Sequence, residues 1–100
     1  MTSTRADWQA AKDVVDAALV AYTRKPADRD IEALTRQLLH HGGLLRSEVE
    51  TLPTSTAALT DWEALTSTGP GDGPLGGWIH ARALARVARR MLKLLGAETR

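Results

Sequence analysis

Two histidines and a glutamate are the residues in this sequence whose types and placement could support acid–base chemistry. His41 and Glu48 are seven residues apart, so on one helix they share a flank about 10 Å long. That distance is too long for a hydrogen bond, but both side chains could line one groove with the histidine as a base. His80 falls on the apolar face of a later helix and would join them if the two helices cross. His41, Glu48 and His80 are therefore the candidate catalytic residues.

Each of these residues also has a structural interpretation. A half-buried His41 bonded to a neighbouring helix, an exposed Glu48 and a core-edge His80 bonded to a backbone carbonyl would need no substrate. This interpretation is favoured, because perturbed titratable groups are often structural. The three histidines occur without any cysteine and without H-E-x-x-H spacing, so no metal site is predicted.

Three further residues are candidates for ligand binding: Trp62, Trp78 and Gly42. The two tryptophans flank the stretch TGPGDGPLGG, residues 68–77, which predicts a flexible loop longer than most helix connections. The indoles could wall a small-molecule pocket under this loop, or they could be the largest core residues, which is favoured. The loop lacks the G-K-[ST] of a phosphate-binding loop and no other cofactor motif occurs, so no cofactor is predicted.

A basic stripe is the candidate partner-binding surface. Arg82, Arg86, Arg89 and Lys93 align on one helix over about 16 Å, and no acidic residue lies between Trp78 and Lys93. An acidic protein partner would fit the stripe, although a solvated face near a helix C-terminus is the commoner explanation. Nucleic acid is not expected, because the net charge is only +1 and no helix-turn-helix pattern is present.

The composition limits the size and the class of the protein that contains these residues. With 100 residues, 43% of them hydrophobic and 25% charged, the chain predicts a single globular domain over residues 1–100. Phenylalanine is absent, so the core must be built from Leu, Val and Ala, which suits closely packed helices. No stretch resembles a signal peptide or a membrane span. We therefore expect a cytoplasmic protein with no membrane contact.

Apolar residues recur at helical spacing in four segments. The first expected helix starts near residue 4, and the second runs from about 27 to 51. The third lies within 54–67, and the fourth covers 78–95. The second continues through His40-His41-Gly42-Gly43, because its apolar stripe keeps phase on both sides. Gly42 lies on that stripe, and a tryptophan is its expected neighbour. The predicted fold is all-α, a small antiparallel bundle of three long helices and one short one.

The segment DIEALTRQLLHHGGLLRSEVETL, residues 30–52, resembles a family of short actinomycete proteins of unknown function. The resemblance covers residues 29–52, is looser over 78–94, where ARALARVARRML falls, and does not reach the first helix. Two glycines stand where the family has bulkier residues, and Ser47 stands where it often has proline. Family members often occur near natural-product gene clusters, so the resemblance implies a role in specialised metabolism. The residues on the family pattern are His41, Leu44, Leu45, Glu48 and Val49.

Two hypotheses follow. The first is a non-catalytic helical accessory protein that binds another protein, or itself as a dimer, with the basic stripe as the polar contact. The alternative is a small enzyme or small-molecule-binding protein of natural-product biosynthesis. Its pocket would lie between the helices expected at 27–51 and 78–95, and whether catalysis occurs at all is left open.

Overall fold

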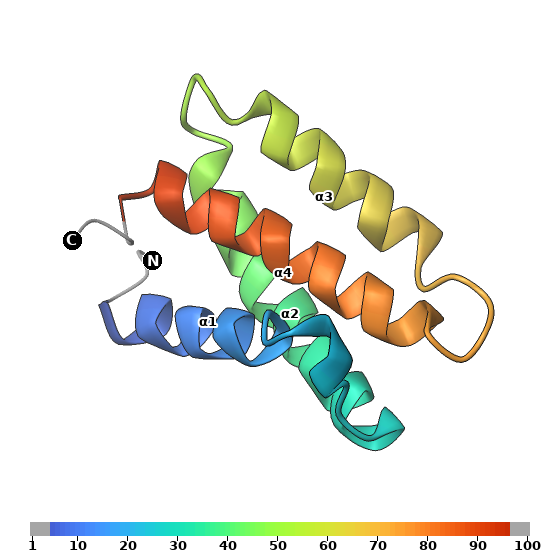
Figure 1. Ribbon diagram of the computed structural model, residues 1–100. Coiled ribbons are helices and arrows are strands. Elements are labelled where there is room, and N and C mark those ends of the chain that lie inside the picture. The colour runs from blue at the N-terminus through green and yellow to red at the C-terminus, as the bar shows by residue number, and fades with distance from the viewer. Residues whose placement is uncertain (1–4, 97–100) are drawn as a thin grey trace.

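The computed structural model describes residues 5–96 and the side chains from Trp8 onward, and it is helical throughout (Figure 1). Within this range there are four α-helices, one short 3-10 helix and no strand. The predicted all-α class with four helices is confirmed. The helix start expected at Thr4 lies outside the described residues. The elements are α1 (Arg5–Ala18), η1 (Tyr22–Arg24), α2 (Asp28–Val49), α3 (Thr56–Thr68) and α4 (Gly76–Leu94).

The lengths of the helices differ from the expectation. α2 has 22 residues and α4 has 19, whereas α1 has 14 and α3 has 13. The division into three long helices and one short one is therefore not confirmed, because α1 and α3 are almost equal. None of the helices among the described residues combines the length and apolarity needed to cross a membrane.

α2 continues without interruption through the two glycines, as the phase of its apolar stripe predicts. Ile31, Leu38, Gly42, Leu45 and Val49 are buried along one face of the helix. Asp28 and Asp30 in the first turn complement the positive end of the helix dipole. Burial of the stripe compensates for two interior glycines, each of which costs about 1 kcal/mol relative to alanine.

α4 is the central helix, because it packs against α1, α2 and α3 (Figure 1). Ala81, Ala85 and Ala88 are fully or almost fully buried and let the neighbouring helices come close to its backbone. The larger buried residues of the same helix fill the spaces on either side of these alanines. They are Trp78, Leu84, Val87, Met91 and Leu92.

The helix directions are not uniformly antiparallel. α3 runs against α4, since Asp61 early in α3 contacts Arg90 late in α4. α2 instead begins at the same end as α4: Ile31 Cγ2 lies 3.7 Å from where a Cβ at Gly77 would be. Figure 1 shows both helices running from the lower right to the upper left. The antiparallel arrangement expected for the whole bundle is therefore not found for the α2–α4 pair.

Gly42 is the point at which α3 approaches α2. A Cβ built on Gly42 would overlap the Trp62 ring and lie only 2.7 Å from its Cζ3. No side chain larger than hydrogen fits there without moving the indole, which is 4% exposed. The expected contact between Gly42 and a tryptophan is confirmed. Arg46 adds a polar link beside it, donating to Glu63 of α3 at 2.8 Å.

Candidate functional site

The three candidate catalytic residues are not brought together. His80 lies beside the start of α2, where it shares a pocket with Ile31 and Thr35. Because α2 and α4 begin at the same end, His41 lies about 9 Å beyond Thr35 along α2 and Glu48 about 20 Å beyond it. The ring of His41 is half-buried and meets His40 edge-on, with 5.2 Å between ring centroids. This arrangement offers no common position for one substrate.

Glu48 is half-buried, and its Oε2 is one of two fully buried side-chain polar atoms without a hydrogen-bond partner among the described residues. The other is Nε1 of Trp8 in α1. A buried polar atom without a partner is costly, so these two atoms oppose folding at the far end of α2 from His80.

Trp62 and Trp78 both belong to the core. Trp62 packs on Gly42, and Trp78 is fully buried, donating from Nε1 to the Tyr22 carbonyl oxygen at 2.9 Å. That bond joins α4 to η1. Neither indole lines any of the three surface pockets described below. The core interpretation is therefore the one that the geometry of both tryptophans supports.

Arg82 differs from the rest of the basic stripe. Its Nη1 donates to the carbonyl oxygens of Ala18, at 3.3 Å, and Val20. Its guanidinium also lies over the Tyr22 and Trp78 rings, 5.6 and 5.4 Å from their centroids. These are the free carbonyls that follow a helix end, so Arg82 caps the C-terminus of α1. This cation is not available to a partner.

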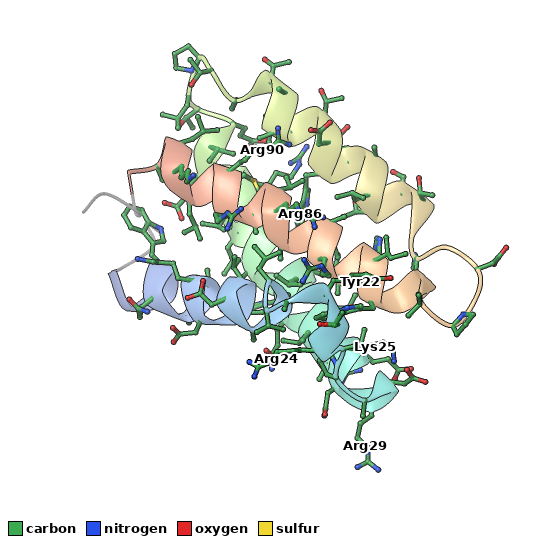
Figure 2. The ribbon with its side chains drawn as sticks, viewed as in Figure 1. Tyr22, Arg24, Lys25, Arg29, Arg86 and Arg90 are labelled. Carbon is green, nitrogen blue, oxygen red and sulfur yellow. The ribbon has the colours of Figure 1, made fainter. Side chains whose placement is uncertain are left out.

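The remaining cations of the stripe line a groove between α3 and α4. The groove has a volume of about 570 Å³. Its apolar wall consists of Ala64, Leu65, Ala83 and Val87, and its polar wall of Asp61, Arg86, Arg89, Arg90 and Lys93. Arg90 is paired with Asp61 across the groove, whereas the other three cations form no ion pair with any described residue. Figure 2 shows Arg86 and Arg90 on the side of α4 that faces α3.

The groove continues toward the start of α3. A second hollow of about 270 Å³ shares Arg90 and Lys93 with it and adds Thr54, Ala57, Ala58 and Leu94. From Ala83 to Leu94 the two hollows follow α4 for about 16 Å. That length matches about three turns of a docked helix. We call the two hollows together the α3–α4 groove.

Basic side chains also occur outside the groove. Arg24, Lys25 and Arg29 lie around η1 and the start of α2 (Figure 2). Lys25 is paired with Asp28 at 3.1 Å. None of these three side chains lines the α3–α4 groove, so they form a separate basic surface.

A smaller pocket of about 430 Å³ lies where α2, the loop after α3 and the start of α4 meet. Its residues are Ile31, Glu32, Thr35, Arg36, Pro70, Gly71, Gly77 and His80. Burial lowers the pKa of His80 from its ordinary value of 6.5, so its ring is neutral at pH 7. Among the described residues, no group of three acidic or histidine side chains could hold a metal ion.

Several of these residues escaped sequence reasoning. Asp61, Ala64 and Leu65 complete the groove, but nothing in the sequence of 54–67 shows that it faces the basic stripe. Glu32 and Arg36 flank the His80 pocket, and their i,i+4 spacing was the one available signal. That spacing is common on solvated helix faces, so by itself it does not predict a pocket.

The helices and surfaces thus define a small all-α protein with a basic groove and a separate polar pocket. Residues 9–100 match a family described as a family of unknown function, DUF6415. The match covers nine tenths of the chain, so the protein belongs to this family, in agreement with the resemblance to proteins of unknown function. Neither a curated protein nor a solved structure matches the chain.

Proposed function

We propose that this protein is a non-catalytic interaction module that binds an acidic segment of a partner protein in the α3–α4 groove. The observation that carries the proposal is the groove itself, which combines an apolar wall with three cations that no described residue pairs. The separation of His41, Glu48 and His80 also favours binding over catalysis.

The shape and charge of the groove indicate its occupant. Ala64, Leu65 and Ala83, which are exposed or half-buried, give the groove an apolar surface. An amphipathic helix of about ten residues would place its apolar stripe there. Carboxylates on the edge of that helix would then meet Arg86, Arg89 and Lys93.

The two walls contribute differently to binding. Ion pairs at exposed positions are worth about 0–1 kcal/mol each, so Arg86 and Arg89 mainly set association rate and partner choice. Burial of apolar surface on Ala64, Leu65 and Ala83 supplies most of the affinity. We therefore expect a moderate, salt-sensitive interaction.

Photo-crosslinking in the native host tests the proposal. A photoreactive amino acid replaces Ala83 in the groove, and the matched control replaces Thr23, which is exposed on η1. We expect crosslinks from position 83 to an acidic segment of one protein, weakened roughly tenfold by Arg86→Gln with Arg89→Gln. Arg24→Gln with Arg29→Gln removes the same charge elsewhere and should leave the crosslinks intact.

Three results would overturn the proposal. Equal crosslinking from positions 83 and 23 would mean that the partner does not bind specifically in the groove. Equal loss in both charge variants would indicate unselective attraction. Nucleic acid at position 83, with log K falling with log salt at a slope near about −2.7 for three phosphate contacts, would replace the acidic protein as the ligand.

We further propose that the protein acts in the cytoplasm of an actinomycete, as an accessory protein of natural-product metabolism. The support is the resemblance over residues 29–52 and 78–94. A second copy of the chain is the other candidate occupant of the groove, because Asp28, Asp30 and Glu32 form an exposed acidic start to α2. Light scattering would detect such a dimer, and crosslinks from position 83 would then map to residues 28–32 of this chain.

A further inference from the structure

The pocket beside His80 is built from three segments that are far apart in the sequence. α2 supplies one wall, Pro70 and Gly71 of the loop supply another, and Gly77 and His80 of α4 close it. The loop is held closely on α4, because a Cβ on Gly76 would overlap the Gly71 carbonyl. Gly69 and Gly73 have positive φ angles of 74° and 92°, which favour glycine. The loop wall is therefore shaped by the backbone.

The first turn of α4 has backbone N–H groups without hydrogen-bond acceptors among the described residues. Gly76 N donates to Gly73 O at 3.2 Å, and the regular helical bonds begin with Ile79 N to Leu75 O at 2.9 Å. The amides of Gly77 and Trp78 between them have no acceptor among the described residues, and of these two residues only the half-buried Gly77 lines the pocket. Leu75, at the cap position, has no side chain able to supply one. The positive end of a 19-residue helix is thus left uncapped at this pocket.

His80 is an independent polar feature of the same pocket. Its side chain lines the pocket although only 7% of the residue is exposed, and its ring makes no hydrogen bond to any described residue. Among the described residues, the fully buried side-chain polar atoms without partners are Trp8 Nε1 and Glu48 Oε2, so the ring nitrogens of His80 keep access to the pocket. A buried imidazole that faces a hollow and lacks a protein partner can bond a bound molecule.

Two opposite charges stand at the edge of the pocket. Glu32 and Arg36 are one helical turn apart on α2, and both line the hollow. They form no ion pair with each other or with any other described residue, so each can meet a ligand charge. Ile31 and Pro70 provide an apolar surface between these charges and the loop.

From this arrangement we propose that the pocket binds a free α-amino acid as its zwitterion. The ligand carboxylate is held by the Gly77 amide with Arg36, and its ammonium by Glu32. His80 hydrogen-bonds the bound ligand, and the ligand side chain lies on Ile31 and Pro70. A volume of about 430 Å³ lies within the range of ordinary small-molecule sites. A simple anion would meet repulsion from Glu32, and a simple amine would meet repulsion from Arg36.

Amide NMR titration of the full chain tests this assignment. The twenty proteinogenic L-amino acids are titrated separately, with acetate and n-butylamine as the two half-ligands. We expect at least one amino acid to shift the Gly77 amide signal saturably, with each half-ligand binding at least about tenfold more weakly. A carboxylate that binds as tightly as its amino acid, or a panel with no saturable shift, overturns the proposal.

Variants assign the two ends of the ligand. Glu32→Gln and Arg36→Gln should each weaken binding by about tenfold, whereas Arg29→Gln, an exposed arginine of α2 outside the pocket, should not. An unchanged affinity in either pocket variant, with the helical circular dichroism retained, contradicts the assigned contact. Arg86→Gln with Arg89→Gln should leave amino-acid binding intact, so this test and that of the α3–α4 groove succeed or fail separately.

Discussion

Substitution of alanine for each of two adjacent glycines in α2 should change stability in opposite directions. Gly42 and Gly43 both have helical backbone angles, so alanine gains about 1 kcal/mol of helix propensity at either position. A Cβ at Gly43 meets nothing within 4 Å. Gly43→Ala should therefore raise the free energy of unfolding by about 0.5–1 kcal/mol.

At Gly42 the same methyl group overlaps the Trp62 ring. Trp62 is buried and cannot swing into solvent without losing its packing, so α3 must shift away from α2. Overpacking of this kind costs about 1–3 kcal/mol or more. Because the overlap involves several ring atoms, we take the upper part of this range. After the propensity gain, Gly42→Ala should destabilise the protein by about 1–2 kcal/mol.

Urea unfolding followed by circular dichroism measures both changes, and each kcal/mol moves the melting temperature by about 4–8 °C in a domain of this size. Trp62→Leu supplies the coupling test, because without the indole Gly42→Ala should lose most of its cost. If Gly42→Ala stabilises the protein as much as Gly43→Ala does, the close approach of α2 and α3 at this point is wrong.

Three further effects are expected. Arg82→Gln should lower the free energy of unfolding by about 1–3 kcal/mol, because its bonds to the end of α1 are lost. The exposed control Arg89→Gln should change it by no more than about 0.5 kcal/mol in urea unfolding, and equal effects of the two variants would contradict the capping role. Burial lowers the pKa of His80 below 6.5, so on acidification the unfolded chain binds a proton at His80 before the folded protein does. The free energy of unfolding should therefore fall as the pH drops from 6.5 through the folded-state pKa. Unfolding from pH 8 to pH 5 should show less of this loss in His80→Gln, and identical profiles would contradict the assignment. Trp78→Phe should cost about 1–3 kcal/mol, because it removes the bond to Tyr22 and leaves a cavity in the core, and a melting temperature at or above the original would refute it.

Helix positions could be predicted because they depend on local spacing. The apolar stripe of α2 specified one helix through the double glycine, and it also placed Gly42 on the buried face. A buried glycine in a chain without phenylalanine left a tryptophan as the natural neighbour, and Trp62 is that neighbour. Both conclusions needed only the periodicity of one segment and the short supply of large side chains.

The relative directions of the helices could not be predicted in this way. A helical stripe shows which face is buried, but it does not show which helix covers it or in which sense. The parallel start of α2 and α4 therefore separates His41 from His80, which the sequence allowed to meet. Arg82 was placed in the basic stripe for the same reason, because its acceptors, the carbonyls of Ala18 and Val20, lie more than sixty residues earlier in the chain.

The central position of α4 has a consequence for synthesis on the ribosome. α1, α2 and α3 each pack on α4, yet all three leave the ribosome before it. Until Gly76–Leu94 has emerged, the parts of their apolar faces that pack on α4 stay uncovered. A chain that stops before residue 76 therefore lacks the surface on which the other three helices pack, and we expect it not to form this bundle.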